Sequence, residues 1–214
     1  MISAKSVFTI SFRRSGTHMV LETIKTNFDF PVVNDVAHPG FDLHTSSILR
    51  QCFHVIYVYR DPRNVMKSLY NYFKYSDWRL WSGFDADLTD VTFSDFLRGK
   101  TKIVNVFCPN FTLMLENPVR AWVEHTNWLV PLNKHDVKGS VFSVKFEDMV
   151  REPENEIQRI SKYLCVGLKN DKPKPLIKMV SQNPINDDVD YTDDDMDFLI
   201  GIAGDRMMEL GYKF

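Results

Sequence analysis

The sequence predicts an α/β fold with a central parallel sheet flanked by helices. Short apolar strands alternate along the chain with longer segments whose apolar residues recur at helical spacing, which is the arrangement that parallel strands need for their crossovers. Two of the strands also run directly into a helix through a polar turn. At 214 residues the chain can bury one full core, so we expect a single domain over residues 1–214.

The first strand-to-helix junction lies near the N-terminus. The apolar run Val7–Phe12 predicts a buried strand, Gly16 permits a tight turn, and Thr17 begins a helix. Because the first N–H groups of a helix have no partner within it, this junction is a candidate anion site. The apolar face of the helix is predicted to hold Leu21, Ile24 and Phe28.

The second junction repeats this pattern. His54–Tyr59 predicts the next strand, Asp61 suits a helix N-cap, and Pro62 suits the first helical position. Arg60 therefore ends a strand, and Ser68 lies in the second turn of the following helix. Ligands of a parallel sheet gather at the carboxyl ends of its strands, which is where both junctions lie.

The other elements are predicted from periodicity and capping signals. Tyr75–Asp90 has no assignable period and is interpreted as a loop or lid. Its aromatic residues either pack the lid or form a wall for an apolar or sugar-like acceptor. They are Trp78, Trp81 and Phe84. The remaining predicted elements are helices at Phe93–Leu97 and Val119–Leu129, a strand at Val141–Lys145, a helix from Pro153, and a terminal helix. The terminal helix is predicted to begin with a Thr192–Asp195 capping box and to end at Gly211. Its predicted apolar stripe is Met196, Leu199, Ala203 and Leu210.

Composition argues against several classes of function. A net charge of -2 gives no basic excess, so no nucleic-acid partner is expected. No apolar stretch approaches the roughly 20 residues of a membrane span, and the first residues lack the pattern of a signal peptide. Three cysteines far apart indicate neither a disulfide framework nor a zinc site, so we expect a reducing, cytoplasmic location. The acidic run Asp193–Asp195 suits a helix N-terminus, and no metal is expected.

The residues at the two junctions narrow the class of anion. Phe12–His18 lacks both the first glycine and the lysine of a Walker-type phosphate loop. Arg14–Thr17 instead resembles the loop that binds the 5′-phosphosulfate of 3′-phosphoadenosine 5′-phosphosulfate (PAPS) in the sulfotransferase family. Tyr57–Ser68 is similar to the 3′-phosphate motif of the same family. Further similar segments follow in the family's order, namely Phe93–Gly99, Trp122–Trp128, Val144–Met149 with Pro153, and Leu210–Tyr212.

The resemblance implies a short, compact sulfotransferase with a P-loop-like fold. It implies transfer of a sulfuryl group from PAPS, without a metal, to a hydroxyl or amine of a small-molecule or glycan acceptor. No oligomeric state is predicted. The residues implied to bind PAPS are Arg13, Arg14, Ser15, Gly16, Thr17, His18, Arg60, Ser68 and Phe146.

Several positions depart from the family's pattern. Arg14 stands where many cytosolic members carry Lys, and Met19 where many have a Trp that stacks on adenine. Phe146 stands where they have a Tyr. An Arg-Lys-Gly-x-x-Gly-Asp-Trp-Lys segment that adds contacts to the 3′-phosphate is absent, and Lys169–Lys178 offers lysines as substitutes. The chain is also short between residues 17 and 38, where cytosolic members build substrate-binding structure.

Sulfuryl transfer needs donors for the leaving phosphate and a base for the acceptor. Arg14 suits the first role, because its planar fork can hold phosphate oxygens while its charge persists at any ordinary pH. Two interpretations of Arg13 stay open: it supports a phosphate electrostatically, or it is simply exposed to solvent. Ser15–Thr17 can serve as an ordinary helix start and as a phosphate cradle at once, since the same N–H groups do both. Ser68 is a ligand if paired with Arg60, and otherwise a helix residue bonded to its own backbone.

A histidine is the expected base, because its reference pKa of about 6.5 leaves it largely neutral at pH 7. His38 is followed by Pro39 and precedes Arg60 by 22 residues, which resembles the family's catalytic His-x-Pro neighbourhood in position. We therefore predict His38 as the base, with His44 as the reserve. The others are placed in the phosphate loop (His18), on a buried strand (His54), and at a helix or loop surface (His125 and His135).

Two other functions stay open at this point. A nucleotide or small-molecule kinase would use ATP through a Walker-type loop and a magnesium carboxylate, and the sequence offers neither pattern. A non-catalytic nucleotide-binding relative that has lost turnover is kept open by Met19 and by the missing C-terminal motif.

Overall fold

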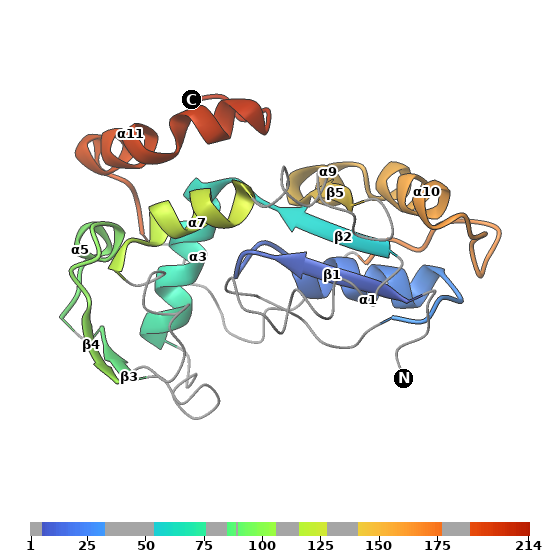
Figure 1. The fold of residues 1–214 in the computed structure, drawn as a ribbon, viewed down its shortest axis with the longest axis horizontal. Helices are drawn as coiled ribbons and strands as arrows, with labels where there is room; N and C mark the ends of the chain where they lie inside the picture. Colours follow the sequence, from blue (N-terminus) through green and yellow to red (C-terminus); the bar gives the residue numbers. More distant parts are fainter. Residues whose placement is uncertain are drawn as a thin grey trace. The chain divides into compact units, whose positions relative to one another are not determined.

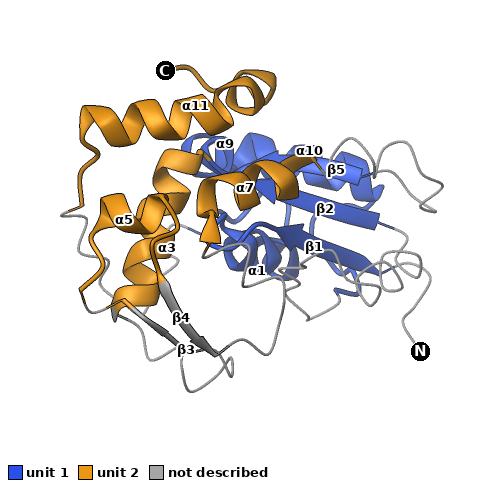
Figure 2. Cartoon of the chain, turned by 60° about the vertical axis from the view of Figure 1, so that its left-hand side comes forward, with its two compact units in different colours: residues 1–60, 128–179 blue, residues 61–127, 180–214 orange. Residues whose placement is uncertain are grey.

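The computed structural model describes residues 6–32, 54–75, 85–88, 90–105, 116–127, 141–176 and 189–214. The chain divides into two compact units, which Figure 2 colours separately. The first unit comprises residues 1–60 and 128–179, and the second comprises residues 61–127 and 180–214. Each unit is described by itself below, and the extent of the predicted domain, residues 1–214, stays a prediction.

The first unit is built on a parallel sheet (Figure 1). In the described part of the chain this sheet has three strands in the order β1-β2-β5, and both pairs of neighbours run parallel. The predicted strands are therefore confirmed. The first strand ends one residue earlier than predicted, because Phe12 already belongs to the turn that leads to the next helix. The strands are β1 (Val7–Ser11), β2 (His54–Tyr59) and β5 (Val141–Lys145).

Helices cover one face of this sheet. Side chains alternate along β2, so Ile56 and Val58 point to the same face. There they meet the apolar stripes of two helices, including Ile24 and Ile157, in one buried cluster. The prediction of a parallel sheet flanked by helices is confirmed. The helices of this unit are α1 (Thr17–Asn27), α9 (Phe146–Arg151) and α10 (Pro153–Leu164), of which α9 is too short to have been predicted from periodicity.

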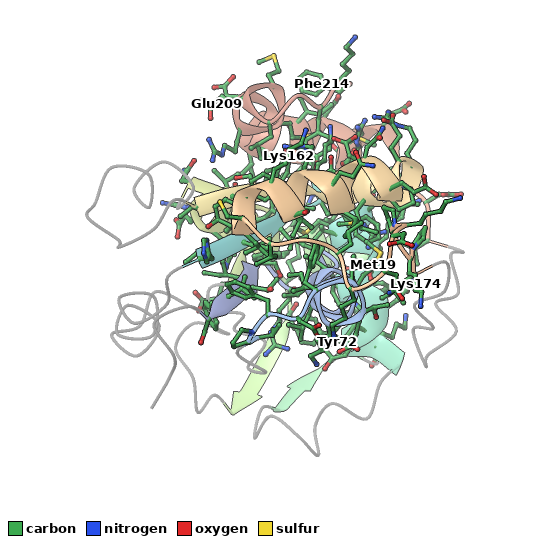
Figure 3. All side chains as sticks on the ribbon, turned by 90° about the vertical axis from the view of Figure 1, so that its right-hand side faces the viewer. Met19, Tyr72, Lys162, Lys174, Glu209 and Phe214 are labelled. Atoms are coloured by element: carbon green, nitrogen blue, oxygen red, sulfur yellow. The ribbon has the colours of Figure 1, made fainter. Side chains whose placement is uncertain are left out.

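Two polar side chains tie α1 and α10 to their surroundings. The hydroxyl of Tyr163 accepts a hydrogen bond from Val55 N at 3.0 Å and donates to Val55 O at 3.1 Å, which anchors α10 on the backbone of β2. Asn27, the last residue of α1, donates to Lys174 O at 3.0 Å and accepts from Lys174 N at 2.7 Å. Figure 3 labels Lys174 on the segment that follows α10 and Met19 on α1. Asn27 thereby holds that segment against the end of α1.

The second unit is mostly helical. Its core contains Leu69, Phe96, Trp122 and Leu199, each fully buried. A short antiparallel pair, β3 with β4, lies partly in the region that was predicted to be a loop or lid. No helix in the described part of the chain is long and apolar enough to cross a membrane. The elements are α3 (Pro62–Tyr75), β3 (Asp85–Asp87), α5 (Phe93–Leu97), β4 (Lys102–Asn105), α7 (Pro118–Asn127) and α11 (Asp193–Glu209).

The terminal helix α11 begins and ends as predicted. Thr192 and Asp195 form a reciprocal capping box, and Gly211 adopts a φ of 76° just beyond the helix. The buried apolar stripe of α11 differs from the predicted stripe at two positions. Met207 is buried where Leu210 was predicted, because Met207 continues the i+4 spacing while Leu210 is already the C-cap residue and half-buried. Met196, also predicted in the stripe, is only half-buried.

Candidate functional site

The loop between β1 and α1 leaves the N-terminus of α1 open. Arg14 has a φ of 66° and Gly16 a φ of 94°, so the chain passes through two left-handed residues before the helix begins at Thr17. Gly16 is the N-cap residue, no side chain caps the helix, and its first turn holds no acidic residue. The positive end of α1 can therefore be satisfied by an external anion.

The second junction is capped by the chain itself. Asp61 Oδ1 accepts a hydrogen bond from Arg63 N at 2.9 Å, and the carboxylate pairs with Arg63 Nη2 at 2.6 Å. The prediction of Asp61 as a cap is confirmed. Its carboxylate already occupies the start of α3, and Arg60 and Ser68 are the side chains predicted to bind an anion near this junction.

Arg60 connects the end of β2 to the loop after β1. Its Nη1 donates to Arg14 O at 3.2 Å, and its guanidinium carbon lies 4.4 Å from the centroid of the Phe146 ring. The sheet register explains this proximity. Tyr59 pairs with Lys145 at the carboxyl ends of two parallel strands, so the next residues, Arg60 and Phe146, leave the sheet at the same edge.

The Phe146 ring also lies against Gly16. A Cβ at Gly16 would stand 2.2 Å from Phe146 Cδ2 and 2.7 Å from its Cε2, well inside van der Waals contact. Gly16 is therefore required for two reasons, its left-handed φ and the ring that packs on its Cα. One aromatic side chain thus contacts both the loop and the arginine.

Hydroxyl groups line the inner side of the loop. Ser11 and Thr17, which lie at the end of β1 and the start of α1, are joined by a hydrogen bond between their hydroxyls. Ser15 is fully buried, and its Oγ has no hydrogen-bond partner among the described residues. A buried hydroxyl without a partner is costly, so it fits a site completed by the oxygen of a ligand or a water molecule.

Most of the predicted site residues lie around this loop, in the first unit. Arg13 and Arg14 are half-exposed, and His18 is exposed on the first turn of α1. Ser68 lies in α3 of the second unit and is buried, and its predicted pairing with Arg60 stays a prediction. The predicted bases His38 and His44, and the aromatic residues Trp78, Trp81 and Phe84, lie outside the described residues.

His38 and His44 stay the predicted bases, and other titratable groups in the described part of the first unit have shifted pKa values. His54 has its pKa lowered by burial, but it begins β2, about 16 Å from the carboxyl end of the strand at about 3.3 Å per residue. Tyr59, beside Arg60, has its pKa raised, first by burial and then by the charge of Asp148. Its phenol therefore stays protonated and cannot accept a proton from an acceptor.

One predicted exposure is wrong. His125 was expected at a helix surface, yet it is only 6% exposed on α7. The sequence carried a signal for this, because His125 stands three residues after the fully buried Trp122 and four after the buried Ala121. His125 belongs to the core of the second unit.

One contribution to the site was missed, and the contacts of another residue were not foreseen. Ser11 was assigned only to a strand, although the last residue of a strand before a phosphate loop is well placed to bond the helix start. Phe146 was assigned to the site by resemblance alone, whereas its contacts with Arg60 and Gly16 follow from the position directly after a parallel strand.

Comparison with known protein families identifies the family to which the chain belongs. The family model described as the sulfotransferase domain matches residues 31–188, which is well over half of the chain. The chain therefore belongs to the sulfotransferase family, as its motifs predicted.

The chain is similar to curated carbohydrate sulfotransferases and to a solved sulfotransferase structure. Carbohydrate sulfotransferase 1 of Rattus norvegicus and of Mus musculus is 25% identical over 166 residues, and that of Homo sapiens is 26% identical. The matches cover 72% of this chain and 31% of each relative, so the chain spans about a third of the length of these relatives. A crystal structure of mouse sulfotransferase SULT7A1 complexed with PAP aligns with a TM-score of 0.49 and 14% identity, covering 95% of this chain and 65% of that one.

Proposed function

We propose that this protein transfers a sulfuryl group from PAPS to a hydroxyl or amine of a small-molecule or glycan acceptor. The observation that carries the proposal is the hydrogen bond from Arg60 Nη1 to Arg14 O, at 3.2 Å. It brings the loop after β1 and the arginine after β2, which we assign to two separate anionic groups, into direct contact. A nucleotide with charged phosphates at both the 5′ and the 3′ positions needs two such elements.

The donor set around the loop fits the 5′ end of this nucleotide. The open N-terminus of α1 offers N–H groups, Ser15 offers a buried hydroxyl without a partner among the described residues, and Gly16 supplies the left-handed φ of the turn. PAPS, when bound, supplies the sulfuryl group and a phosphate as its leaving group. We assign Arg14 to stabilise the negative charge that gathers on this phosphate, because its guanidinium keeps its charge at any ordinary pH.

The 3′-phosphate is assigned to Arg60, with Ser68 as a second ligand on the strength of the sequence motif. The acceptor's proton is assigned to His38, with His44 as the reserve. We further propose that transfer needs no metal and that the protein works in the cytoplasm.

Equilibrium binding tests the proposal directly. We expect 3′-phosphoadenosine 5′-phosphate (PAP), the product nucleotide, to bind at least tenfold more tightly than 5′-AMP in isothermal titration calorimetry, because charge-assisted hydrogen bonds to the extra phosphate contribute about 1.5–3 kcal/mol. ATP serves as the ligand of the rival kinase function. Equal affinity for PAP and 5′-AMP, or tighter binding of ATP with magnesium, would contradict the proposal.

The variant Arg60→Ala should remove most of the preference for PAP while 5′-AMP still binds. Ser68→Ala should reduce the preference by a smaller factor, since a neutral hydroxyl contributes less than a guanidinium. Arg151→Ala, which removes an exposed guanidinium on α9 of the same unit, is the control for general electrostatic attraction and should leave the preference unchanged.

A further inference from the structure

The contact between Arg60 and Phe146 brings together one residue that follows β2 and one that follows β5. The guanidinium carbon of Arg60 lies 4.4 Å from the ring centroid, which is within the range of a cation–π interaction. The ring also contacts the loop, because a Cβ at Gly16 would stand only 2.2 Å from Phe146 Cδ2. The ring is therefore held by the loop and in turn holds the arginine.

Arg60 is fixed at two points by these neighbours. Its planar group rests on the ring of Phe146 and donates through Nη1 to the carbonyl of Arg14. An arginine side chain otherwise samples many rotamers, and ordering it on binding lowers affinity. A guanidinium held in one orientation before a phosphate arrives avoids that cost.

We propose that Phe146 is a positioning residue, which holds Arg60 in the orientation that binds the 3′-phosphate and thereby sets the preference for a 3′-phosphorylated nucleotide. This inference rests on the proposed function, because it assigns Arg60 to the 3′-phosphate. Phe146 acts through its ring face, so an aromatic replacement preserves the effect and an aliphatic one of similar volume does not.

Calorimetry on three variants tests the role of the ring. Phe146→Leu should lower PAP affinity about tenfold and leave 5′-AMP affinity within about twofold, so the ratio of the two falls, whereas a merely unfolded or loosened site would lose both. Phe146→Tyr should restore the wild-type ratio. Phe142→Leu is a matched control, since Phe142 lies on β5, the strand directly before Phe146, and carries the guanidinium of Arg159 over its ring at 5.1 Å.

The outcomes are distinct. A wild-type ratio in Phe146→Leu, an equal loss in Phe142→Leu, or no rescue by Phe146→Tyr would each overturn the positioning role. If the wild-type protein shows no preference for PAP over 5′-AMP, the proposed function fails, and the contact between Phe146 and Arg60 is then judged by the next measurement alone.

Nuclear magnetic resonance of the arginine side chains needs no ligand, and its first measurement needs only the wild-type protein and Arg60→Lys. In the wild-type protein, the Arg60 Nε–H resonance, assigned by its loss in Arg60→Lys, should be displaced upfield by the ring current of Phe146. The displacement should persist in Phe146→Tyr and Phe142→Leu and disappear in Phe146→Leu. An undisplaced Arg60 resonance in the wild-type protein would refute the inference.

Discussion

The guanidinium of Arg98, at the end of α5, donates to the carboxylate of Asp195, the third residue of α11. Asp195 is 2% exposed, also accepts a hydrogen bond from Ser94 Oγ at 2.7 Å, and forms the capping box with Thr192. One buried carboxylate thus starts a helix and joins it to another. Burial raises the pKa of Asp195, but the hydrogen bonds outweigh burial and lower its pKa to about 2.

Asp195→Asn should destabilise the protein at pH 7 by about 2–3 kcal/mol, because a pKa lowered from the ordinary value near 3.8 to about 2 is a contribution of this size. The sign follows from the lowered pKa. The stabilisation is fully present above about pH 4 and is lost as the pH falls toward 2, so the difference between variant and wild type should shrink over that interval. Urea unfolding between pH 7 and pH 3 measures it.

The matched control is Asp194→Asn, which removes the other carboxylate that pairs with Arg98. The side chain of Asp194 is 88% exposed, and exposed pairs contribute little. We expect no measurable change. Equal losses of unfolding free energy in the two variants would show that the burial of Asp195 does not strengthen its contribution to stability.

Two glycine substitutions in the second unit should act in opposite directions. Gly99 has a φ of 69°, and a Cβ there would stand 1.5 Å from the carbonyl oxygen of Glu116, so Gly99→Ala should cost at least about 2 kcal/mol. Gly201 lies in α11 with open space around it, so Gly201→Ala should stabilise the protein by about 0.5–1 kcal/mol. Thermal unfolding of both variants checks the pair, and a stable Gly99→Ala would be incompatible with this turn.

Removal of the Arg14 side chain should lower turnover about a hundredfold, which is the scale of losing one strong transition-state donor. Because Arg14 has a φ of 66°, the informative variant is Arg14→Gly, which removes the side chain and adopts a left-handed φ without strain. Arg14→Lys should retain part of the activity. Transfer from radiolabelled PAPS gives the rates.

Arg13→Gly is the companion to this experiment and decides between the two interpretations of Arg13. A salt-dependent loss of PAP affinity means that Arg13 supports a phosphate electrostatically, and no change means that it is simply exposed. An unchanged rate in Arg14→Gly would place Arg14 outside the reaction.

Replacement of the base should separate chemistry from binding. His38→Asn should leave PAP affinity nearly intact and cut transfer to a panel of hydroxyl and amine acceptors by about 10² to 10⁴, because a general base acts on the acceptor and not on the nucleotide. Loss of transfer in His44→Asn alone would move the base to the reserve residue. If wild type binds PAP but transfers to no acceptor, the non-catalytic relative becomes the better description.

The two strand-to-helix junctions could be predicted because their signals are local. An apolar run, a glycine that can adopt a positive φ and a capping residue such as Asp61 act within a few residues of one another. The terminal helix was predicted for the same reason, since Thr192 and Asp195 form their capping box within four residues.

Other features depend on partners that are distant in the sequence. The pair β3–β4 is too short to show alternation, and α9 is a single short helix after a strand. The stacking of Arg60 on Phe146 depends on how two strands, far apart in the chain, align in the sheet. The buried state of His125 depends on the packing of α7 in the second unit, where His125 lies one helical turn after the fully buried Trp122.

The division of the chain into units has a consequence for folding order. Each unit is assembled from two stretches separated by part of the other, residues 1–60 with 128–179 and residues 61–127 with 180–214. During synthesis β1 and β2 can therefore pair early, but β5 reaches them only after more than half of the chain has been made, and α11 comes last. Long-range parallel pairing of this kind is slow. No single cut can divide the chain into two fragments that each contain one whole unit.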